Sequence, residues 1–375
     1  MSTPVYLDYN ATVPVRPEAA DAMTAALGEV GNASSVHRFG RATRRRVEAA
    51  REAIAALAGA RPSQVVFTSG GTEANNMALL GTGRPRILVS AGEHDSVLRA
   101  MPQAERIPLQ RDGRIDLTAL ATMLADDPRP ALVSVMLANN ETGVIQPVAE
   151  VATLARQFGA RVHCDAVQAA GKLPVDIARF GVDLMTLSAH KLGGPQGVGA
   201  LIVADEAPLQ AIVHGGGQER GFRAGTENVP AIAGFGAAAQ AAMAGIDGMK
   251  RLGEWRDRLE AQVRRVAPMV TIHGADAPRL ANTSCIGLPG VTAETQVMAL
   301  DLAGVAVSSG SACSSGKVHP SHVLAAMGVA RDEAGSAIRV SLGWRTAEGD
   351  IERFLDAWSR VARRHQGAAE ASPAA

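Results

Sequence analysis

The feature that most constrains the fold is an alternation of short apolar runs with helical stretches, which begins near Gln64. The runs are rich in valine, isoleucine and leucine, as is typical of strands buried on both faces. We interpret as strands the runs at 65–67, 86–89, 131–135, 161–164, 182–187 and 200–203. Helical stretches such as 72–80 and 148–158 separate several of them. The alternation predicts an α/β fold with a large, mostly parallel sheet covered by helices on both faces.

The pattern differs at the two ends of the chain. Helices are predicted at 17–27 and 39–57, and past residue 248 a long charged helix at 250–266 precedes a short strand at 270–272 and further short strands and helices. We therefore expect a large α/β domain at residues 15–249. Residues 1–14 and 250–366 are expected to form a smaller α+β domain, and residues 367–375 a flexible tail.

The composition argues against nucleic acid and membrane partners. Lys+Arg equals Asp+Glu, 37 against 37, so no net field attracts a polyanion. A basic run around Arg44 invites a nucleic-acid interpretation, but Arg44 and Glu48 are spaced i,i+4, which favours a solvated helical face. The first residues lack the pattern of a secretory signal, and no apolar run approaches the roughly 18 residues that span a bilayer.

The cysteines and histidines indicate neither a disulfide framework nor a metal site. Cys164, Cys285 and Cys313 are widely spaced and odd in number, which favours a reducing cytoplasm. Cys164 lies within a strand and Cys285 among small residues, so both are predicted to be buried, inert thiols. His319 and His322 are spaced i,i+3 without an evident third ligand, so we interpret them as residues at a helix start.

Lys191 follows the predicted strand at 182–187. It is either a lysine whose stem lies on apolar surface with its amine in water, or an amine that forms a Schiff base with a carbonyl cofactor. Residues 70–72, Gly-Gly-Thr, follow another strand and begin a helix. That turn suits a phosphate, through free backbone N–H groups, or a plain glycine-rich cap.

Further strand ends are followed by polar residues: His94, Asn140 and Asp165. Each alone is compatible with an ordinary hydrogen-bonding or capping role. In an open parallel sheet, however, ligands collect beyond the carboxyl ends of the strands. A phosphate cradle, an aspartate for a pyridinium nitrogen, an imidazole for the ring face, an amide near its hydroxyl and a lysine for its aldehyde together describe a pyridoxal phosphate site.

Nine segments carry a more specific signal, at 7–12, 31–37, 68–73, 138–141, 163–168, 188–191, 215–220, 223–226 and 308–315. Through them the sequence resembles the class V aminotransferase branch of fold-type I pyridoxal phosphate proteins, and specifically the cysteine desulfurases of the iron-sulfur-cluster and nitrogen-fixation type. The resemblance runs from about Tyr6 to Gly343. It implies a fold-type I homodimer that binds pyridoxal 5'-phosphate and acts on L-cysteine.

The resemblance also implies a role for each matching residue. It makes Lys191 the Schiff-base lysine, His94 the stacked imidazole that assists proton transfer, and Asp165 the partner of the pyridine nitrogen. The remaining cofactor contacts that it implies are Gln168 at the ring hydroxyl, Gly71, Thr72, Ser188 and His190 at the phosphate, and Thr226 reaching that phosphate from the other subunit. The substrate carboxylate is assigned to Asn140, also counted among the cofactor contacts, and to Arg339, whose planar fork suits a carboxylate.

Cys313 separates a desulfurase from an ordinary aminotransferase. It lies among serines and glycines without apolar periodicity, which predicts an exposed, mobile loop. The expected reaction converts L-cysteine to L-alanine and leaves the sulfur as a persulfide on Cys313, for iron-sulfur cluster assembly or another thiolation. The alternatives are a selenocysteine lyase, another class V aminotransferase, or a non-catalytic partner in sulfur transfer.

Three departures from the family pattern bear on these expectations. Asp95 and Ser96 follow His94 where a more apolar pair is common, and Gln196 replaces a frequent lysine; neither is expected to touch an assigned role. The tail at 368–375 lacks the features with which longer relatives dock a scaffold. A sulfur-acceptor or iron-sulfur scaffold protein is expected, but its identity stays open.

Overall fold

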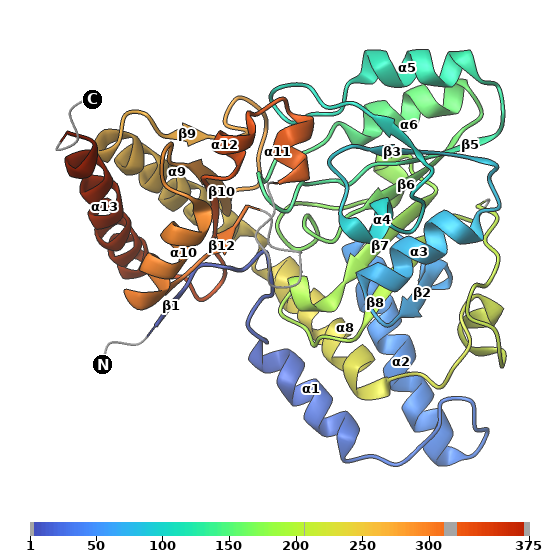
Figure 1. The fold of residues 1–375 in the computed structure, drawn as a ribbon. Coiled ribbons are helices and arrows are strands. Elements are labelled where there is room, and N and C mark those ends of the chain that lie inside the picture. The colour runs from blue at the N-terminus through green and yellow to red at the C-terminus, as the bar shows by residue number, and fades with distance from the viewer. Residues whose placement is uncertain (1–3, 206, 311–320, 371–375) are drawn as a thin grey trace.

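The computed structural model describes residues 4–205, 207–310 and 321–370, and the side chains of this part of the chain up to residue 365. Two larger sheets, each with its own helices, lie side by side (Figure 1). The larger body carries the seven-stranded sheet, and the smaller one contains the last helix of the chain.

The seven-stranded sheet has the order β2-β8-β7-β6-β5-β3-β4. Its strands are β2 (Val65–Thr68), β8 (Gly199–Val203), β7 (Leu184–Ser188), β6 (Arg161–Asp165), β5 (Ala131–Ser134), β3 (Arg86–Ser90) and β4 (Glu105–Ile107). Only β8 runs antiparallel to its neighbours. The predicted α/β fold and all six predicted strands are confirmed. The edge strand β4 was missed, because Glu105 and Arg106 interrupt its apolar character.

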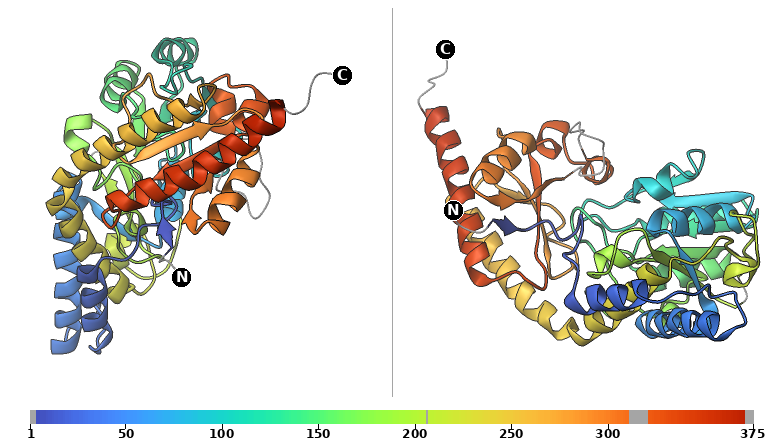
Figure 2. Two further views of the ribbon diagram at one scale, coloured as in Figure 1. Left: turned by 90° about the vertical axis from the view of Figure 1, so that its left-hand side faces the viewer. Right: turned by 90° about the horizontal axis from the view of Figure 1, so that it is seen from below.

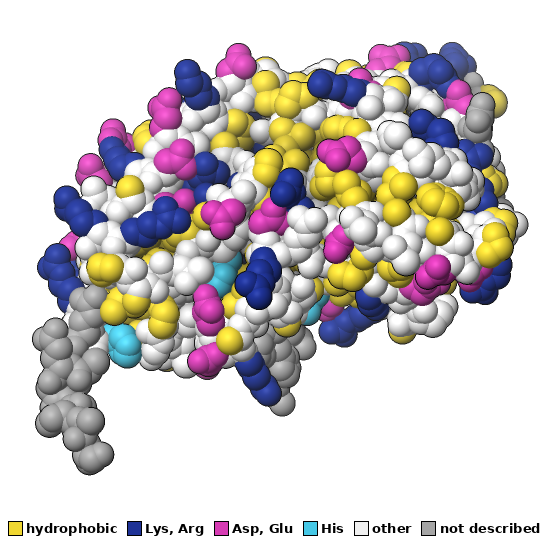
Figure 3. Space-filling view, turned by 90° about the horizontal axis from the view of Figure 1, so that it is seen from above, with side chains coloured by type: hydrophobic (Ala, Val, Ile, Leu, Met, Phe, Trp, Pro, Cys, Tyr) yellow, Lys and Arg dark blue, Asp and Glu magenta, His cyan; other side chains and the backbone are white. Residues whose placement is uncertain are grey.

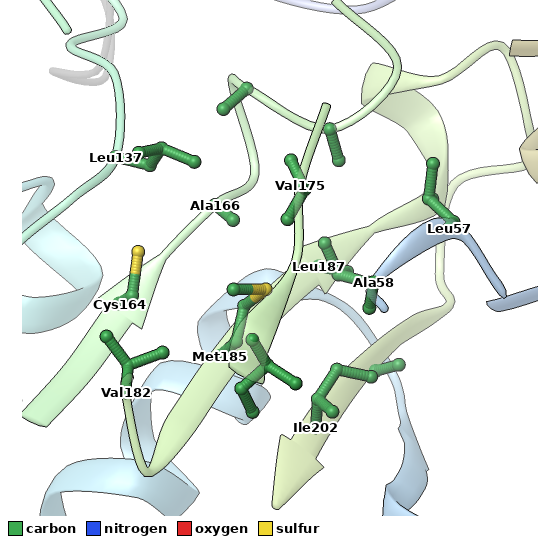
Figure 4. Packing of buried hydrophobic residues seen from close by; sticks show 14 of the residues in the cluster. Leu57, Ala58, Leu137, Cys164, Ala166, Val175, Val182, Met185, Leu187 and Ile202 are labelled. Carbon is green, nitrogen blue, oxygen red and sulfur yellow. The ribbon is translucent and has the colours of Figure 1, made fainter. Parts of the chain in front are cut away.

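Helices cover both faces of this sheet. On one face lie α2 (Arg38–Leu57), α5 (Leu117–Asp126), α6 (Val148–Gln157) and α8 (Val229–Ala244), with α1 (Pro17–Leu27) against α8. The opposite face carries α3 (Gly71–Gly81) and α4 (Asp95–Leu98). Figure 4 shows Cys164, Met185 and Ile202 among the hydrophobic side chains of the first face. Each such buried side chain contributes about 1.5–3 kcal/mol, and the two apolar faces explain why the strands read as continuous apolar runs.

The smaller body is built on an antiparallel sheet in the order β12-β13-β10-β9. The bounds are β12 (Ser308–Ser309), β13 (Ala337–Ser341), β10 (Thr283–Gly287) and β9 (Thr271–Ile272), and beside them β1 (Val5–Tyr6) pairs with β11 (Val305–Ala306). The apolar sides of α9 (Met249–Val266), α10 (Ala293–Leu302) and α13 (Glu348–Glu370) pack on this sheet around Phe354 and Trp358, which have no exposed surface.

Two segments connect the bodies. The α8 and α9 helices follow one another with a bend of 56°, and Figure 2 shows them running from one body to the other. Residues 8–13 form the second connection: Tyr9 N–H donates to the Ser341 carbonyl of the small sheet, and Val13 N–H donates to the His190 carbonyl beyond β7. The segment at 8–13 therefore lies where the two sheets meet.

The surface agrees with the balanced charge. Acidic and basic side chains are interspersed on the face drawn in Figure 3. The basic run of α2 forms the predicted solvated face, with Arg44 and Arg45 exposed, although Glu48 pairs with Arg51 at 3.2 Å rather than with Arg44. Across the described ranges, no single helix has both the length and the apolar composition of a membrane span; only α8 and α9 taken together, across their bend, meet those criteria.

Candidate active site

A cavity of about 340 Å³ lies beyond the carboxyl ends of β2, β5, β6 and β7. Its lining contains ten of the predicted site residues: Gly71, Thr72, His94, Asn140, Asp165, Gln168, Ser188, His190, Lys191 and Arg339. Thr226 is exposed and lies outside this lining, and Cys313 lies outside the described residues. The structure thus brings together side chains that are up to 268 positions apart, from Gly71 to Arg339.

The turn between β2 and α3 provides an anion site at one end of the cavity. Gly70 has a φ of 154°, which L side chains rarely adopt. A Cβ on Gly71 would lie 3.1 Å from Val167 Cγ2, so glycine lets the backbone approach β6 and β7 closely. Gly71 and Thr72 belong to the first turn of α3, whose N–H groups have no partners within the helix. Free N–H groups and the helix dipole favour a phosphate there.

Asp165 ends β6 with only 7% of its surface exposed. Its Oδ2 accepts a hydrogen bond from Asn75 Nδ2 at 2.8 Å, and its Oδ1 accepts one from Val167 N–H at 2.9 Å. Both donors are neutral. Because a buried carboxylate is costly unless a cation meets it, this side chain is suited to face a protonated ring nitrogen.

His94 has a hydrogen-bonding environment that assigns its protonation. Its Nδ1 accepts from Ser96 N–H at 3.1 Å and lies 2.8 Å from Ser96 Oγ. Since Ser96 Oγ itself accepts from Asn75 Nδ2 at 2.8 Å, its own proton points to Nδ1. Burial lowers the pKa of His94, and Lys191 lowers it further, against the opposing effect of Asp165. The imidazole is therefore neutral at pH 7, with its proton on Nε2.

This geometry corrects one expectation. The pair Asp95 and Ser96 was predicted to touch no assigned residue, yet Ser96 fixes the tautomer of His94 and Asp95 faces the same ring electrostatically. The prediction was wrong because it considered only the identity of the neighbours and not the α4 helix start, where His94 is the N-cap and its side chain bonds back to Ser96.

Lys191 ends the short turn after β7 and points its amine at the segment that crosses between the sheets. Its Nζ donates to the carbonyl of Asn10 and, at 2.8 Å, to that of Ala11. Gln168 Nε2 donates to the same Asn10 carbonyl at 2.9 Å. His190 lies 3.3 Å from Thr12 Oγ1, and burial followed by Lys191 lowers the pKa of His190 to about 4.

Arg339 reaches the cavity from the small sheet, in the middle of β13. Its Nη2 donates to Asp8 Oδ1 at 2.7 Å and its Nη1 to the Asn140 carbonyl at 3.1 Å. Its Nε is buried without a partner within the described part of the chain, as is Asn75 Oδ1, and both residues line the cavity. Buried polar atoms of this kind call for a ligand or water.

The two described cysteines are not suited to chemistry. Cys164 and Cys285 are free and fully buried. The predicted burial of both is therefore confirmed, and burial raises the pKa of both thiols well above the usual range, which disfavours the reactive thiolate. His322 begins α11 (His322–Ala326), as predicted, with its Nε2 2.9 Å from the Glu93 carbonyl. No cluster of possible metal ligands occurs among the residues with described positions, and His319 is not one of them.

Three residues of the site were not singled out from the sequence. Asn10 lies in a motif that carried the resemblance but had no assigned role, Asn75 is one helical turn beyond the Gly-Gly-Thr turn, and Lys172 follows Gln168 by four positions. Spacing on a helix was the available signal for Asn75. Lys172 stands in an apolar stretch after a strand end, which is the same signal that marked Lys191.

Comparison with known proteins places the chain in context. The aminotransferase class-V family model matches residues 5–354. A cysteine desulfurase of Cereibacter sphaeroides is 46% identical over 94% of each chain. A NifS-like protein from Rickettsia africae superposes with a TM-score of 0.89 at 35% identity, covering 96% of this chain and 99% of its own. SspA in complex with cysteine superposes with a TM-score of 0.77 at 28% identity, covering 90% of this chain and 98% of its own.

Proposed function

Because the chain belongs to the aminotransferase class-V family, we propose that it is a cysteine desulfurase, which converts L-cysteine to L-alanine and passes the sulfur to an acceptor. The structural observation that supports this proposal most strongly is that Lys191, Asp165 and Arg339 line a single cavity next to the first turn of α3. A reactive amine, a buried carboxylate, a carboxylate-binding arginine and an anion site are the parts that such a reaction needs.

The lining fits pyridoxal 5'-phosphate. Gly71, Thr72, Ser188 and His190 would hold the phosphate, Asp165 the pyridine nitrogen, and Gln168 the ring hydroxyl. His94 would lie on the ring, and Asn140 beside it. When bound, the cofactor supplies an electron sink for a carbanion at the substrate Cα.

The residues of this chain would then divide the remaining work. Lys191 Nζ, held by two backbone carbonyls, removes the Cα proton. Arg339 and Asn140 orient the substrate carboxylate, for which the unpartnered Arg339 Nε is available. The neutral His94 has an Nε2–H with which to donate a hydrogen bond to the substrate.

Sulfur transfer would fall to Cys313. Its thiolate attacks the sulfur of the bound cysteine and forms an S–S bond. The Cβ–S bond of the substrate breaks, its electron pair remains with Cβ, and Cβ takes up a proton while Lys191 returns a proton to Cα. Alanine leaves, and Cys313 keeps the sulfur as a persulfide. This assignment rests on the sequence, because residues 311–320 lie outside the described part of the chain.

We also propose a cytoplasmic homodimer that delivers sulfur to an acceptor or iron-sulfur scaffold protein. The position of Thr226 supports the dimer, since it is exposed and outside its own cavity. The loop before Thr226 is firmly held: Glu219 has a positive φ of 46° and forms a buried ion pair with Arg51 at 2.7 Å. A rigid loop is suited to presenting a hydroxyl to a neighbouring subunit.

The test is formation of alanine by the purified, cofactor-loaded protein. L-cysteine should yield alanine without a keto acid, and Cys313→Ala should keep the absorption of the bound cofactor while making alanine at least about a hundredfold more slowly. Cys285→Ala, the matched control, should retain activity. Normal turnover by Cys313→Ala would overturn the nucleophile assignment, and turnover only with an added keto acid would indicate an aminotransferase.

A further inference from the structure

A second lysine lies beside the site, on the far side of the segment that Lys191 contacts. Lys172 Nζ donates to Asn10 Oδ1 at 2.9 Å and to Gln168 Oε1 at 2.8 Å. A second cavity of about 40 Å³ is lined by both Lys172 and Lys191, with Tyr9, Asn282 and Trp344 on its other walls. Asn10 thus contacts both amines, Lys191 through its backbone carbonyl and Lys172 through its side chain.

We propose that Lys172 is a positioning residue for the reaction, which orients the Gln168 carboxamide and acts electrostatically on the nitrogen of Lys191. This inference rests on the proposed function and adds to it a residue that contacts neither the cofactor nor the substrate directly. The following observations carry it.

The first observation is the orientation of two carboxamides. A lysine amine at this position donates, so it selects the oxygen end of Gln168 and turns the Gln168 NH₂ group toward the Asn10 carbonyl and the main cavity. Asn10 is oriented in the same way: its Oδ1 accepts from Lys172 and, at 3.1 Å, from Asn282 Nδ2. Its NH₂ group consequently donates to Thr283 Oγ1 at 2.9 Å, in the small sheet. Lys172 therefore fixes which end of Gln168 meets a bound ring.

The second observation is the proximity of like charges. Burial lowers the pKa of Lys172 well below its usual range, and Lys191 and Arg339 add repulsion in the same direction. An interaction between two titrating groups is mutual, so a proton on Lys172 disfavours one on Lys191. The other groups that face Lys191 are His94 and His190, which interact with it electrostatically, and Asp165 and Arg339 in the same cavity lining. An unprotonated nitrogen is what Lys191 needs both to bind a carbonyl and to accept a proton.

The third observation is the scarcity of lysine. Of 37 basic residues only four are lysines, at positions 172, 191, 250 and 317, so two of the four lie in or beside this site. Arginine stays protonated in proteins, whereas the lysine amine titrates and is compact. Elsewhere the chain meets its need for positive charge with arginine. A lysine at position 172 provides a compact donor between Asn10 and Gln168.

The experiment titrates the absorption of the cofactor-loaded protein against pH, which gives the pKa of the Lys191 nitrogen joined to the cofactor. In the pH range in which Lys172 is protonated, Lys172→Met should raise that pKa by about one unit, as expected for removal of a like charge that lines the same small cavity. Lys172→Arg should restore a value near that of the natural protein. The exposed Lys250→Met, the matched control, should leave it unchanged.

The possible outcomes separate this inference from the proposed function. If the natural protein shows no absorption band with pyridoxal phosphate, the proposed function and this inference both fail. If the band is present but titrates alike in the natural protein and in Lys172→Met, only the inference fails. If Lys172→Met does not fold, Lys172→Gln carries the same test, because it keeps a donor and loses the charge. An unchanged pKa in that variant overturns the electrostatic role.

Discussion

The two sheets contribute to the cavity in different ways. The seven-stranded sheet presents His94, Asn140, Asp165 and Lys191 just beyond the ends of its strands, whereas the small sheet presents Arg339 from the middle of β13. Parallel strands end at a common edge, so residues that follow them in the sequence converge in space. Antiparallel strands have no common edge. The position of Arg339 follows from its pairing with Asp8 and the Asn140 carbonyl, both far away in the sequence.

Under the proposed function this contrast implies a division of function: the large sheet would hold the cofactor, and the small sheet would contribute Arg339 to the recognition of the substrate. Changes in the large sheet should therefore reduce cofactor binding, whereas changes in the small sheet should affect the Michaelis constant for L-cysteine while the cofactor stays bound.

The largest effect is expected at Asp165. Asp165→Asn removes the charge that faces the ring nitrogen and should weaken pyridoxal phosphate binding about a hundredfold, the size of a lost buried charge-assisted hydrogen bond. Equilibrium titration of the apoprotein measures this. Asp183→Asn is the matched control, because Asp183 pairs with Arg161 at the opposite edge of the same sheet. Equal affinities in the two variants would break the proposed division.

A smaller and different effect is expected at Arg339. Arg339→Lys loses the planar fork, so the KM for L-cysteine should rise about ten- to thirtyfold with little change in cofactor affinity. Steady-state kinetics gives the ratio of the KM values of Arg339→Lys and the natural protein for L-cysteine. Arg279 is a largely buried arginine of the small body that pairs with Glu260 at 2.8 Å, and in Arg279→Lys the KM should stay the same. A loss of cofactor from Arg339→Lys would contradict the assignment.

The smallest effect is expected at His163, which lies in the interior of the large sheet and not among the residues at the strand ends that line the cavity. His163 lies inside β6 between Ser134 Oγ at 2.9 Å and Thr186 Oγ1 at 3.0 Å, and burial lowers its pKa to about 4. Because the unfolded chain binds the proton first, stability is full above pH 6.5 and falls as the pH falls toward 4. His163 should account for a loss of about 1.4 kcal/mol between pH 7.5 and 5.5.

Chemical denaturation at pH 7.5 and at pH 5.5 measures this loss of stability. The loss of stability between the two pH values should be about 1.4 kcal/mol smaller in His163→Gln than in the natural protein. In His214→Gln, a change at an exposed histidine, the loss should equal that of the natural protein. If His163→Gln lost as much stability as the natural protein, His163 would not be a neutral residue of the core.

The sequence predicted the large sheet better than the small one, for the same physical reason. Six strands buried on both faces are continuous apolar runs, and His94, Asp165 and Lys191 lie at a strand end or within four residues after one. Arg339, by contrast, was assigned only through resemblance. The hydrogen bonds centred on Asn10 could not be predicted, because they join residues from positions 10, 168, 172 and 282 whose approach depends on how the two bodies pack. The contact of Ser96 with His94 was missed because it depends on a helix start.

The central claim is that Lys191, and not its neighbour Lys172, is the amine that binds the cofactor. Borohydride reduction of the pyridoxal phosphate-loaded protein makes that bond permanent, and peptide mass spectrometry then locates it among the four lysines. We expect one modified residue per chain, at Lys191. Modification at Lys172, or the absence of any modified lysine, would contradict it.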